Sequence, residues 1–551
     1  MRSQRVMQPS QMLKDYEVMK DSQITYEGDI VHFALYADDE PMSFEEALKN
    51  DKWVNAMKEE LKLIETNHTW QLMELPKLKR PIAVKWVFKV KRNPAGEVVK
   101  HKARLVAKGF LQKKGVDYGE IFAPVARIET VRLVVAIASM KGWSMYQLDV
   151  KSAFLNGPLE EEVLVKQTPG FEVVGHEGKV YKLKKALYGL KQAPRAWNKK
   201  IDSVLIQIGF SKCISEHGVY VKGEYESDLV ILCLYVDDLL ITGNNKIEID
   251  KIKQLLKNQF EMTDLGSLSY FLGIEFKETE AGIVMHQSKY ATDLLKKFRM
   301  TNCNATATPT ETGLALSLRD EGEPVDETQY RQIVGSLRYL CNTRPDLAFS
   351  VGLISRFMQA PKTPHMMAAK RILRYIRGTI NYGILLPNTI TNSNMELVGY
   401  TDSDWRRDND DRKSTAGYIF LLGDALVSWS SKKQDPVALS TYEVEYIAAS
   451  MCSCQGLWLR KLLKEMKIQK TEAINILVDN KSAISFAKNP IDHGGSKHIE
   501  TRYHFIRDKV SKGKVKLLYC KLEDNLADLL TKPLKKNKFE DLRNKMMIMI
   551  E

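Results

Sequence analysis

Two adjacent aspartates, Asp237 and Asp238, lie between two apolar runs in the segment VILCLYVDDLLITGNN, residues 230–245. Such runs are typical of buried β-strands, so the pair is predicted at the tip of a hairpin. Neighbouring carboxylates repel each other unless a cation neutralises them. Mg²⁺ prefers oxygen ligands and is often held by one or two carboxylates together with substrate phosphates. The pair alone is interpreted as a polar turn, because aspartate is a favoured turn residue.

A third carboxylate changes that interpretation. Asp149 ends the strand-like run WSMYQLDV and precedes a helix-like start, 88 residues before Asp237. A carboxylate on a neighbouring strand would complete a site for two divalent ions about 3.5–4 Å apart. With Asp149 included, a metal site is favoured over a simple turn.

A second set of acidic residues lies towards the C-terminus. Asp402 and Asp479 each follow an apolar, strand-like run, whereas Glu445 and Asp528 fall on helix-like stretches. Glu443 lies two residues before Glu445 and is an alternative member. Each of these acids, taken alone, is interpreted as a surface charge.

The elements that would position these residues alternate between helix and strand patterns. Residues 43–70 have a helical period, with Ser43 as the predicted N-cap ahead of Glu46. The segment KWVFKVKRNPAGEVVKHKARLVAKGF, residues 85–110, indicates two strands joined by an NPAG turn. Residues 77–114 contain 13 lysines and arginines and one acid, Glu97. That imbalance favours contact with phosphates over a solvated basic face.

Composition and pattern divide the chain into five segments. Residues 1–40 are polar and weakly patterned, which predicts a leader or linker, and residues 41–300 alternate between strand and helix patterns. Residues 301–394 begin with a stretch rich in Thr, Pro, Gly and charge at 301–325, interpreted as a linker, and continue with helical patterns. A new α/β block runs from 395 to 535 and is followed by a tail at 536–551.

The overall composition narrows the class of protein. A chain of 551 residues is expected to form two to four domains. The net charge of +13 suggests a polyanionic partner such as nucleic acid, with a generally basic protein as the alternative. Seven scattered cysteines without a C-x-x-C pair argue against a disulfide framework or zinc finger. No apolar run reaches about 18 residues, which predicts a soluble, intracellular protein that does not enter a membrane.

Several long motifs resemble those of one family. YVDDLL, residues 235–240, resembles the Y-x-D-D box of reverse transcriptases. QLDVKSAFLNGPLEEEV, KLKKALYGLKQAPRAWN and KHKARLVAKGFLQKKGVDYGEIFAPVARIETVR resemble copia-type LTR retrotransposon Pol polyproteins, in one order from about residue 40 to 535. The resemblance implies an α+β fold. It comprises a right-hand polymerase with fingers and palm at 41–300, thumb or connection helices at 301–394, and an α/β ribonuclease H-like domain at 395–535.

The resemblance also implies roles in the polymerase. Asp149, Asp237 and Asp238 would hold two Mg²⁺ ions, with Mn²⁺ as the alternative metal, and catalyse in-line nucleotidyl transfer. Lys102 and Arg104 would bind the phosphates of the dNTP, with Lys89 and Lys91 as alternatives. Phe154 would block a ribose 2′-hydroxyl, with core packing as its alternative role. Gly189 and Gln192 would lie under the incoming base pair, where a close approach favours a small residue such as Gly189.

The second acidic set resembles the four-carboxylate site of ribonuclease H, formed by Asp402, Glu445, Asp479 and Asp528. Glu445 is preferred over Glu443 because E-Y-I-A matches the family pattern, in which an alanine follows the acid three residues later. Four carboxylates would hold a second pair of Mg²⁺ ions and activate water against a phosphodiester. The segment SKHIETRYHFIRDKV would add a basic helix against the hybrid, with His498 and His504 in structural roles.

The function implied is RNA-directed DNA synthesis with ribonuclease H cleavage, as the C-terminal portion of a longer Pol polyprotein. RNA template, DNA primer, RNA–DNA hybrid and dNTPs are the predicted partners, with other Pol or Gag products of the element as further ones. A cytoplasmic virus-like particle or the nucleus is the predicted location. The alternative is a catalytically silent nucleic-acid-binding relic. An ordinary host phosphoryl-transfer enzyme is disfavoured because no P-loop motif is present.

Overall fold

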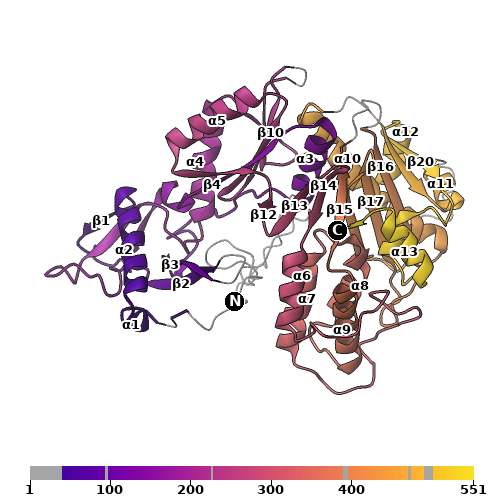
Figure 1. Ribbon diagram of the computed structural model, residues 1–551, viewed down its shortest axis with the longest axis horizontal. Helices are drawn as coiled ribbons and strands as arrows, with labels where there is room; N and C mark the ends of the chain where they lie inside the picture. Colours follow the sequence, from indigo (N-terminus) through magenta and orange to yellow (C-terminus); the bar gives the residue numbers. More distant parts are fainter. Residues whose placement is uncertain are drawn as a thin grey trace, which may run out of the picture. The chain divides into compact units, whose positions relative to one another are not determined.

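The structure is a computed structural model that describes residues 40–41, 43–92, 97–224, 227–388, 395–468, 473–488 and 501–550 (Figure 1). Most of the predicted leader, the NPAG turn and His498 lie outside these residues. Helices and strands are mixed along the chain, in agreement with the predicted mixture of α and β elements. The chain forms two compact units: Met1–Pro124 with Val150–Leu205, and Val125–Asp149 with Ile206–Glu551.

The first unit contains a hairpin, a three-stranded sheet and a few helices. Ser43 caps the first helix by accepting the N–H of Glu46, which confirms the predicted N-cap. The predicted single helix is broken after it, because Asn50 caps a second helix. The elements are α1 (Phe44–Ala47), α2 (Asp51–Thr66), β1 (Trp70–Met73), β2 (Val84–Arg92), β3 (Val98–Ala107), η4 (Gly109–Leu111), η5 (Ala153–Asn156), β5 (Pro158–Val165), β6 (Val180–Lys185) and α4 (Ala193–Gln207).

The hairpin of β2 and β3 has one buried face and one basic face. Trp86, Phe88 and Leu105 are buried on the face whose partners include Trp53 of α2. Strand alternation places the lysines on the opposite face, because successive side chains point to opposite sides. The two predicted strands are therefore confirmed, and the pairing explains why their charge is concentrated on one side.

The second unit begins with a six-stranded sheet that carries the Asp237–Asp238 pair. Helix α3 is buried along almost its whole length, as expected of a helix that is apolar all round. The strands, in spatial order, are β11 (Met262–Ser267), β4 (Met145–Val150), β10 (Asp238–Gly243), β9 (Val230–Tyr235), β8 (Val219–Lys222) and β7 (Ser211–Lys212). Of these, β4, β10, β9, β8 and β7 pair antiparallel. The helices that accompany this sheet are α3 (Ile128–Lys141) and α5 (Lys246–Gln259).

A second sheet of this unit, with five strands, and a group of helices follow. The segment interpreted as a linker is bound to helix α9 (Thr363–Gly378): Arg374 Nε donates to the Asn304 carbonyl at 2.8 Å and Arg377 Nε to the Thr301 carbonyl at 2.7 Å. The strands are β12 (Tyr270–Phe271), β13 (Ile274–Thr279), β14 (Gly282–His286), β15 (Tyr382–Pro387) and β21 (Ile548–Met549). The helices are α6 (Ser288–Lys297), α7 (Glu327–Leu340), η6 (Pro345–Leu347), α8 (Ala348–Ile354), η7 (Ser355–Phe357) and α9 (Thr363–Gly378).

The third sheet of this unit is mixed and carries the second acidic set. Strand β16 is antiparallel to β17 but parallel to β19, and α10 packs across these strands. The strands, in spatial order, are β18 (Ala425–Lys433), β17 (Thr415–Leu422), β16 (Leu397–Ser403), β19 (Ile474–Val478) and β20 (Val515–Tyr519). The helices are α10 (Thr441–Glu465), α11 (Lys481–Lys488), η8 (Thr501–His504), α12 (Phe505–Ser511), η9 (Leu526–Leu530) and α13 (Lys536–Asn544).

Within the described ranges, the chain has no helix that is both long and apolar enough to cross a bilayer.

Candidate functional site

The structure pairs two of the first three predicted carboxylates across one sheet and places the third in the adjoining turn. Asp149 on β4 and Asp238 on β10 are direct partners across the antiparallel pair. Side chains of such partners lie on the same face, with Cβ atoms about 4.5–5.5 Å apart. Asp237 occupies the two-residue turn between β9 and β10, and all three aspartates are partly exposed. Within the described residues, the oxygens of these three aspartates do not all come within 4.8 Å of one another, so their joint binding of a hard divalent cation stays a prediction.

The turn that carries Asp237 has an unusual backbone. Val236 precedes it with φ of 55°, the left-handed region that a β-branched residue rarely adopts. Such a conformation costs on the order of 1–3 kcal/mol and persists only where the surrounding structure holds it. The paired strands β9 and β10 therefore force the tight turn that places the two aspartates side by side.

The four predicted phosphate-binding residues share one face of the first unit's hairpin. Lys102 is the direct cross-strand partner of Lys89, and Lys100 is the partner of Lys91. Arg104 lies two residues beyond Lys102 and points to the same face. Like charges opposite each other destabilise a sheet, and an anionic ligand would relieve that repulsion. The preferred pair, Lys102 and Arg104, therefore lies on the same surface as the alternatives Lys89 and Lys91.

Arg104 is held by two residues that the sequence did not single out. Its Nη1 lies 3.2 Å from Oε2 of Glu60, a carboxylate on α2 that is only 2% exposed. The guanidinium carbon lies 4.7 Å from the centre of the Tyr188 ring. Burial raises the pKa of Glu60, and the nearby charge of Arg104 opposes that rise. Glu60 and Tyr188 thus fix the guanidinium from two directions.

Tyr188 also connects Arg104 to Phe154. The Tyr188 and Phe154 rings pack edge to face, with centroids 5.4 Å apart, and both side chains are buried. Phe154 lies in the short 3₁₀ helix η5, where a helix-like start was predicted. Its burial is compatible with core packing and with a sugar-blocking role, so that role stays a prediction.

Gly189 lies against the end of β3, and Gln192 contacts Gln112 and Asp117, which follow that strand. A Cβ on Gly189, whose φ is 82°, would lie 2.3 Å from the carbonyl oxygen of Ala107, so no larger residue fits there. The buried Gln192 accepts from the Gln112 amide at 2.9 Å and donates to the Asp117 carbonyl at 2.8 Å. Both residues therefore shape the segment that carries Tyr188. Their contact with a base pair stays a prediction.

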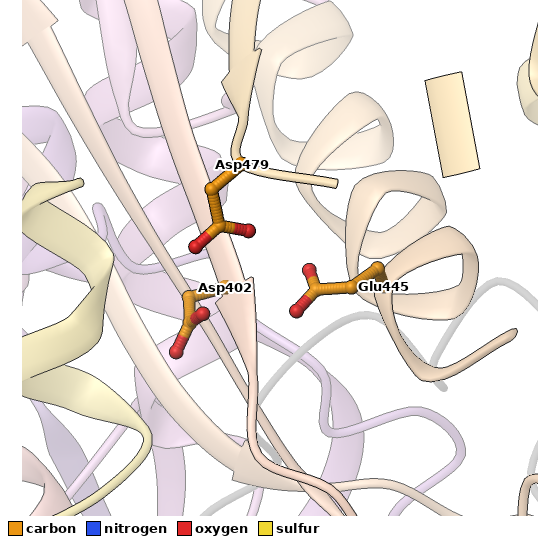
Figure 2. A group of neighbouring side chains, drawn as sticks. All are labelled: Asp402, Glu445 and Asp479. Atoms are coloured by element: carbon orange, nitrogen blue, oxygen red, sulfur yellow. The ribbon is translucent and has the colours of Figure 1, made fainter. Parts of the chain in front are cut away.

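Three of the four predicted carboxylates of the second set converge (Figure 2). Asp402 is on β16, Asp479 directly follows the parallel neighbour β19, and Glu445 is on the first turns of α10. Parallel strands bring their carboxyl ends to the same edge of the sheet, which explains why Asp402 and Asp479 meet. One ligand oxygen from each of the three lies within 4.8 Å of the others.

The electrostatics of this trio fit a cation. Burial and the neighbouring carboxylates raise the pKa of Asp402 to about 7, although Lys532 opposes the rise. Burial also raises the pKa of Asp479, and it raises that of Glu445 well above the ordinary value. Oε2 of Glu445 is buried and has no hydrogen-bond partner among the described residues. A buried, unsatisfied carboxylate oxygen is unfavourable unless a ligand completes it, so the donor set suits a hard divalent ion.

Asp528 lies beside the trio but is bound to lysines. Its fully buried carboxylate is 2.7 Å from Lys532 Nζ and also pairs with Lys538. Lys532 Nζ is 3.3 Å from Asp402 as well, and the Thr531 hydroxyl donates to Asp402. Lys532 thus stands between the two aspartates. It lies four residues after Asp528, an i,i+4 spacing that could have marked it in the sequence.

Glu443 and His504 have other partners. The Glu443 carboxylate accepts the backbone N–H of Leu439 at 2.8 Å, ahead of α10, whereas Glu445 belongs to the trio. His504 Nδ1 lies 3.0 Å from the hydroxyl of Tyr446, a contact that joins η8 to α10. His498, on the predicted basic helix, is outside the described residues.

Comparison with known proteins shows which family and which relatives this chain resembles. A family described as "Reverse transcriptase (RNA-dependent DNA polymerase)" matches residues 67–312. The Pol polyprotein of transposon TNT 1-94 from Nicotiana tabacum is 42% identical over 521 residues, covering 92% of this chain and 39% of that protein. That of transposon RE1 from Arabidopsis thaliana is 41% identical over 513 residues, covering 93% and 35%. This chain therefore spans little more than a third of those relatives.

Two further matches are a shorter transposon protein and a solved structure. A putative transposon Ty5-1 protein from Saccharomyces cerevisiae is 35% identical over 306 residues, which cover 55% of this chain and 98% of that protein. A solved foamy viral protease-reverse transcriptase in complex with an RNA/DNA hybrid matches at 12% identity with a TM-score of 0.47, over 88% of this chain and 55% of that chain. The structural similarity is too low to support an inference.

Proposed function

Because this chain belongs to the copia-type Pol polyproteins of retrotransposons, we propose that it is an RNA-directed DNA polymerase that also cleaves RNA in RNA–DNA hybrids. The chain has two carboxylate clusters at different places in the sequence, which supports the proposal of two separate reactions. The observation that carries the polymerase is the pairing of Asp149 with Asp238 beside Asp237. RNA template, DNA primer and dNTPs are the proposed partners.

For DNA synthesis, we assign the metal ligands to Asp149, Asp237 and Asp238. Mg²⁺ bound there would supply Lewis-acid activation of the primer hydroxyl and neutralisation of the triphosphate. The strained turn at Val236 would hold Asp237 and Asp238 in place before a metal or nucleotide binds. The basic face with Lys102 and Arg104 would bind the triphosphate, and the buried Phe154 would select the deoxyribose.

For hybrid cleavage, we assign the metal ligands to Asp402, Glu445 and Asp479, with Asp528 as the fourth carboxylate. The orphaned Oε2 of Glu445 supports a cation in this site. Asp528 would join the ligands if a cation displaced the Lys532 ammonium from between it and Asp402. Recognition would depend on hybrid shape and the 2′-hydroxyl.

Primer extension on an RNA template tests the proposal directly. With Mg²⁺ and dNTPs the chain is expected to extend a DNA primer, and with a labelled RNA strand it is expected to shorten that strand. The silent-relic alternative predicts hybrid binding without either product. Omission of the metal serves as the control, because both carboxylate sites require one.

A further inference from the structure

An exposed tryptophan lies next to the second carboxylate cluster. Residues 404–414 join β16 to β17 and begin at the end of β16 that carries Asp402. Trp405, three residues after Asp402, is 51% exposed, although tryptophan is usually largely buried. This loop, which we call the Trp405 loop, therefore presents a large aromatic ring at the edge of the sheet where the acids converge.

The Trp405 loop is firmly held. The buried carboxylate of Asp408 accepts the backbone N–H groups of Asp410 and Asp411 at 3.0 and 3.2 Å. The same carboxylate pairs with Arg356 at 2.8 Å and Lys433 at 2.6 Å. A loop fixed at its centre by a buried, doubly paired acid presents its outer residues in a defined arrangement. Little ordering entropy would then be lost on binding.

The loop's negative charges have partners within the protein, although Asp411 is itself exposed. Asp404 accepts the N–H of Thr415, Asp410 accepts the Ser317 hydroxyl at 2.6 Å, and Asp411 pairs with Lys433 at 2.8 Å. These partners satisfy the acids within the protein. The loop contains equal numbers of acidic and basic residues, and these contacts neutralise most of the acidic ones.

Among the residues that the structure describes, two of the loop's four basic side chains face outward without an acidic partner. Arg406 and Arg412 are exposed, and within the described part of the chain neither forms an ion pair. Both have left-handed backbone conformations, with φ of 51° and 58°, which are uncommon for residues other than glycine. Strained positions of this kind concentrate at functional sites. The outer surface of the loop therefore combines two unpaired guanidinium groups with an exposed aromatic ring.

We propose that the Trp405 loop binds an RNA–DNA hybrid and holds it against the Asp402 cluster. Arg406 and Arg412 contact phosphates, and Trp405 packs on a sugar in the minor groove. Arginine suits phosphate oxygens because its planar fork donates two parallel hydrogen bonds. The minor groove of an A-form helix is wide and shallow and displays the 2′-hydroxyls that the RNA strand of a hybrid carries. The inference rests on the proposed hybrid cleavage, since that reaction requires the hybrid at this edge.

The test compares cleavage and extension on the same hybrid. In single-turnover cleavage, Arg406→Ala with Arg412→Ala should raise the protein concentration for half-maximal rate about tenfold. The slope of log affinity against log salt should become shallower by about 1.8, because two phosphate contacts are lost. Trp405→Ala should weaken cleavage, and Trp405→Phe should restore most of it. Extension from the primer on the same hybrid should change less than about twofold, because the loop serves only the cleavage site.

A matched control comes from the same unit. Lys464 is an exposed cation near the C-terminal end of α10, about 28 Å along the helix from Glu445. Lys464→Ala should leave the half-maximal concentration of cleavage unchanged. Unchanged half-maximal concentration and salt slope in a folded double variant would overturn the proposal, and so would an equal loss of extension. If the unmodified chain cleaved no hybrid, the proposed reaction would fail instead. Salt-dependent anisotropy of a labelled hybrid in EDTA would then still test the loop.

Discussion

Glu60 illustrates at the scale of one residue how a buried charge bears on a proposed binding site. Its carboxylate pairs with Arg104, and Oε1, its other oxygen, has no hydrogen-bond partner among the described residues. Glu60→Leu should free the guanidinium and raise the KM for dNTP about tenfold, which corresponds to about 1.4 kcal/mol, with kcat changed less. Steady-state extension with varied dNTP measures both quantities.

Two variants separate positioning by Glu60 from a purely structural role. Glu60→Gln keeps an oxygen that can accept from Arg104 and should retain most of the dNTP affinity. Glu59→Gln removes a neighbouring pair with Lys100 that is largely exposed, and exposed pairs contribute little. If Glu60→Leu lowered kcat, hybrid binding and melting temperature together while KM stayed constant, Glu60 would be structural only.

Phe154 gives a second prediction at this scale. Its ring is buried and packs on Tyr188. Because the Tyr188 ring also contacts Arg104, Tyr188 fixes Phe154 on the side of Arg104. Phe154→Val should open space for a 2′-hydroxyl and raise the rNTP to dNTP incorporation ratio about tenfold, or about 1.4 kcal/mol of lost discrimination. Single-nucleotide extension with matched series measures the ratio. An unchanged ratio in an active variant would return Phe154 to the ordinary core.

The Asp402 cluster predicts a dependence on pH. In the unfolded chain Asp402 ionises near its ordinary pKa of 3.8, whereas burial raises the folded pKa to about 7. The folded chain therefore binds more protons between these values, and without metal its free energy of unfolding falls as pH rises through that window. Mg²⁺ needs the ionised acids, so the rise in melting temperature on adding Mg²⁺ should be larger at pH 8 than at pH 5.5.

Asp402→Asn provides the control for that measurement. An amide cannot ionise, so this variant should show a smaller pH dependence without metal and a smaller effect of Mg²⁺. Equal Mg²⁺ shifts at both pH values in the unmodified chain would argue against metal binding by these acids.

At the scale of elements, the packing of η9 on β17 positions Asp528 and Thr531. Gly417 on β17 is the cross-strand partner of Asp402, and a Cβ there would lie 2.8 Å from Leu530 and 2.9 Å from Thr531. Gly417→Ala should push η9 outward and slow hybrid cleavage about tenfold or more, because small displacements of reacting groups are costly. Extension should be unaffected. Cleavage at wild-type rate in this variant would show that the position of η9 is not critical.

The sequence predicted elements best where the pattern is repeated over many residues. The strands of the basic hairpin and of the Asp237–Asp238 hairpin follow directly from apolar alternation and length. The break between α1 and α2 was missed because Asn50 acts as a local cap within an otherwise helical period. The attachment of residues 301–308 to α9 was missed because it depends on arginines donating to carbonyls, which no composition rule identifies.

The site residues were predictable to the extent that carboxylates at strand ends are conspicuous. Glu60, Tyr188 and Lys532 were not singled out, since each acts through a contact between segments distant in sequence or through a charge that resembles an ordinary surface group. Glu445 and Glu443 could not be separated by physical pattern, because both are acids on one helix. Their partners separate them: Glu443 accepts a backbone N–H, and Glu445 faces Asp402.

At the scale of the whole molecule, both carboxylate clusters belong to the second unit. Helix α3, which precedes Asp149 in sequence, packs against β18 of the sheet that carries Asp402. Its buried Arg132 donates to the carbonyls of Val427 and Asn342 at 3.0 and 2.9 Å and lies 3.8 Å from the centre of the Trp429 ring. These contacts join α3 to the sheet that carries Asp402, so loss of folding should remove both proposed reactions.

Isosteric substitutions should nevertheless separate the two reactions. Asp238→Asn and Asp479→Asn remove one charge each with little change of volume and leave contacts such as that of Arg132 intact. Asp238→Asn should abolish primer extension and retain hybrid cleavage, and Asp479→Asn should do the reverse, with a loss of about a hundredfold or more in the affected reaction. Both rates are measured on one hybrid substrate, and circular dichroism verifies folding. Loss of both reactions in a folded variant would mean that the two clusters do not act as independent sites.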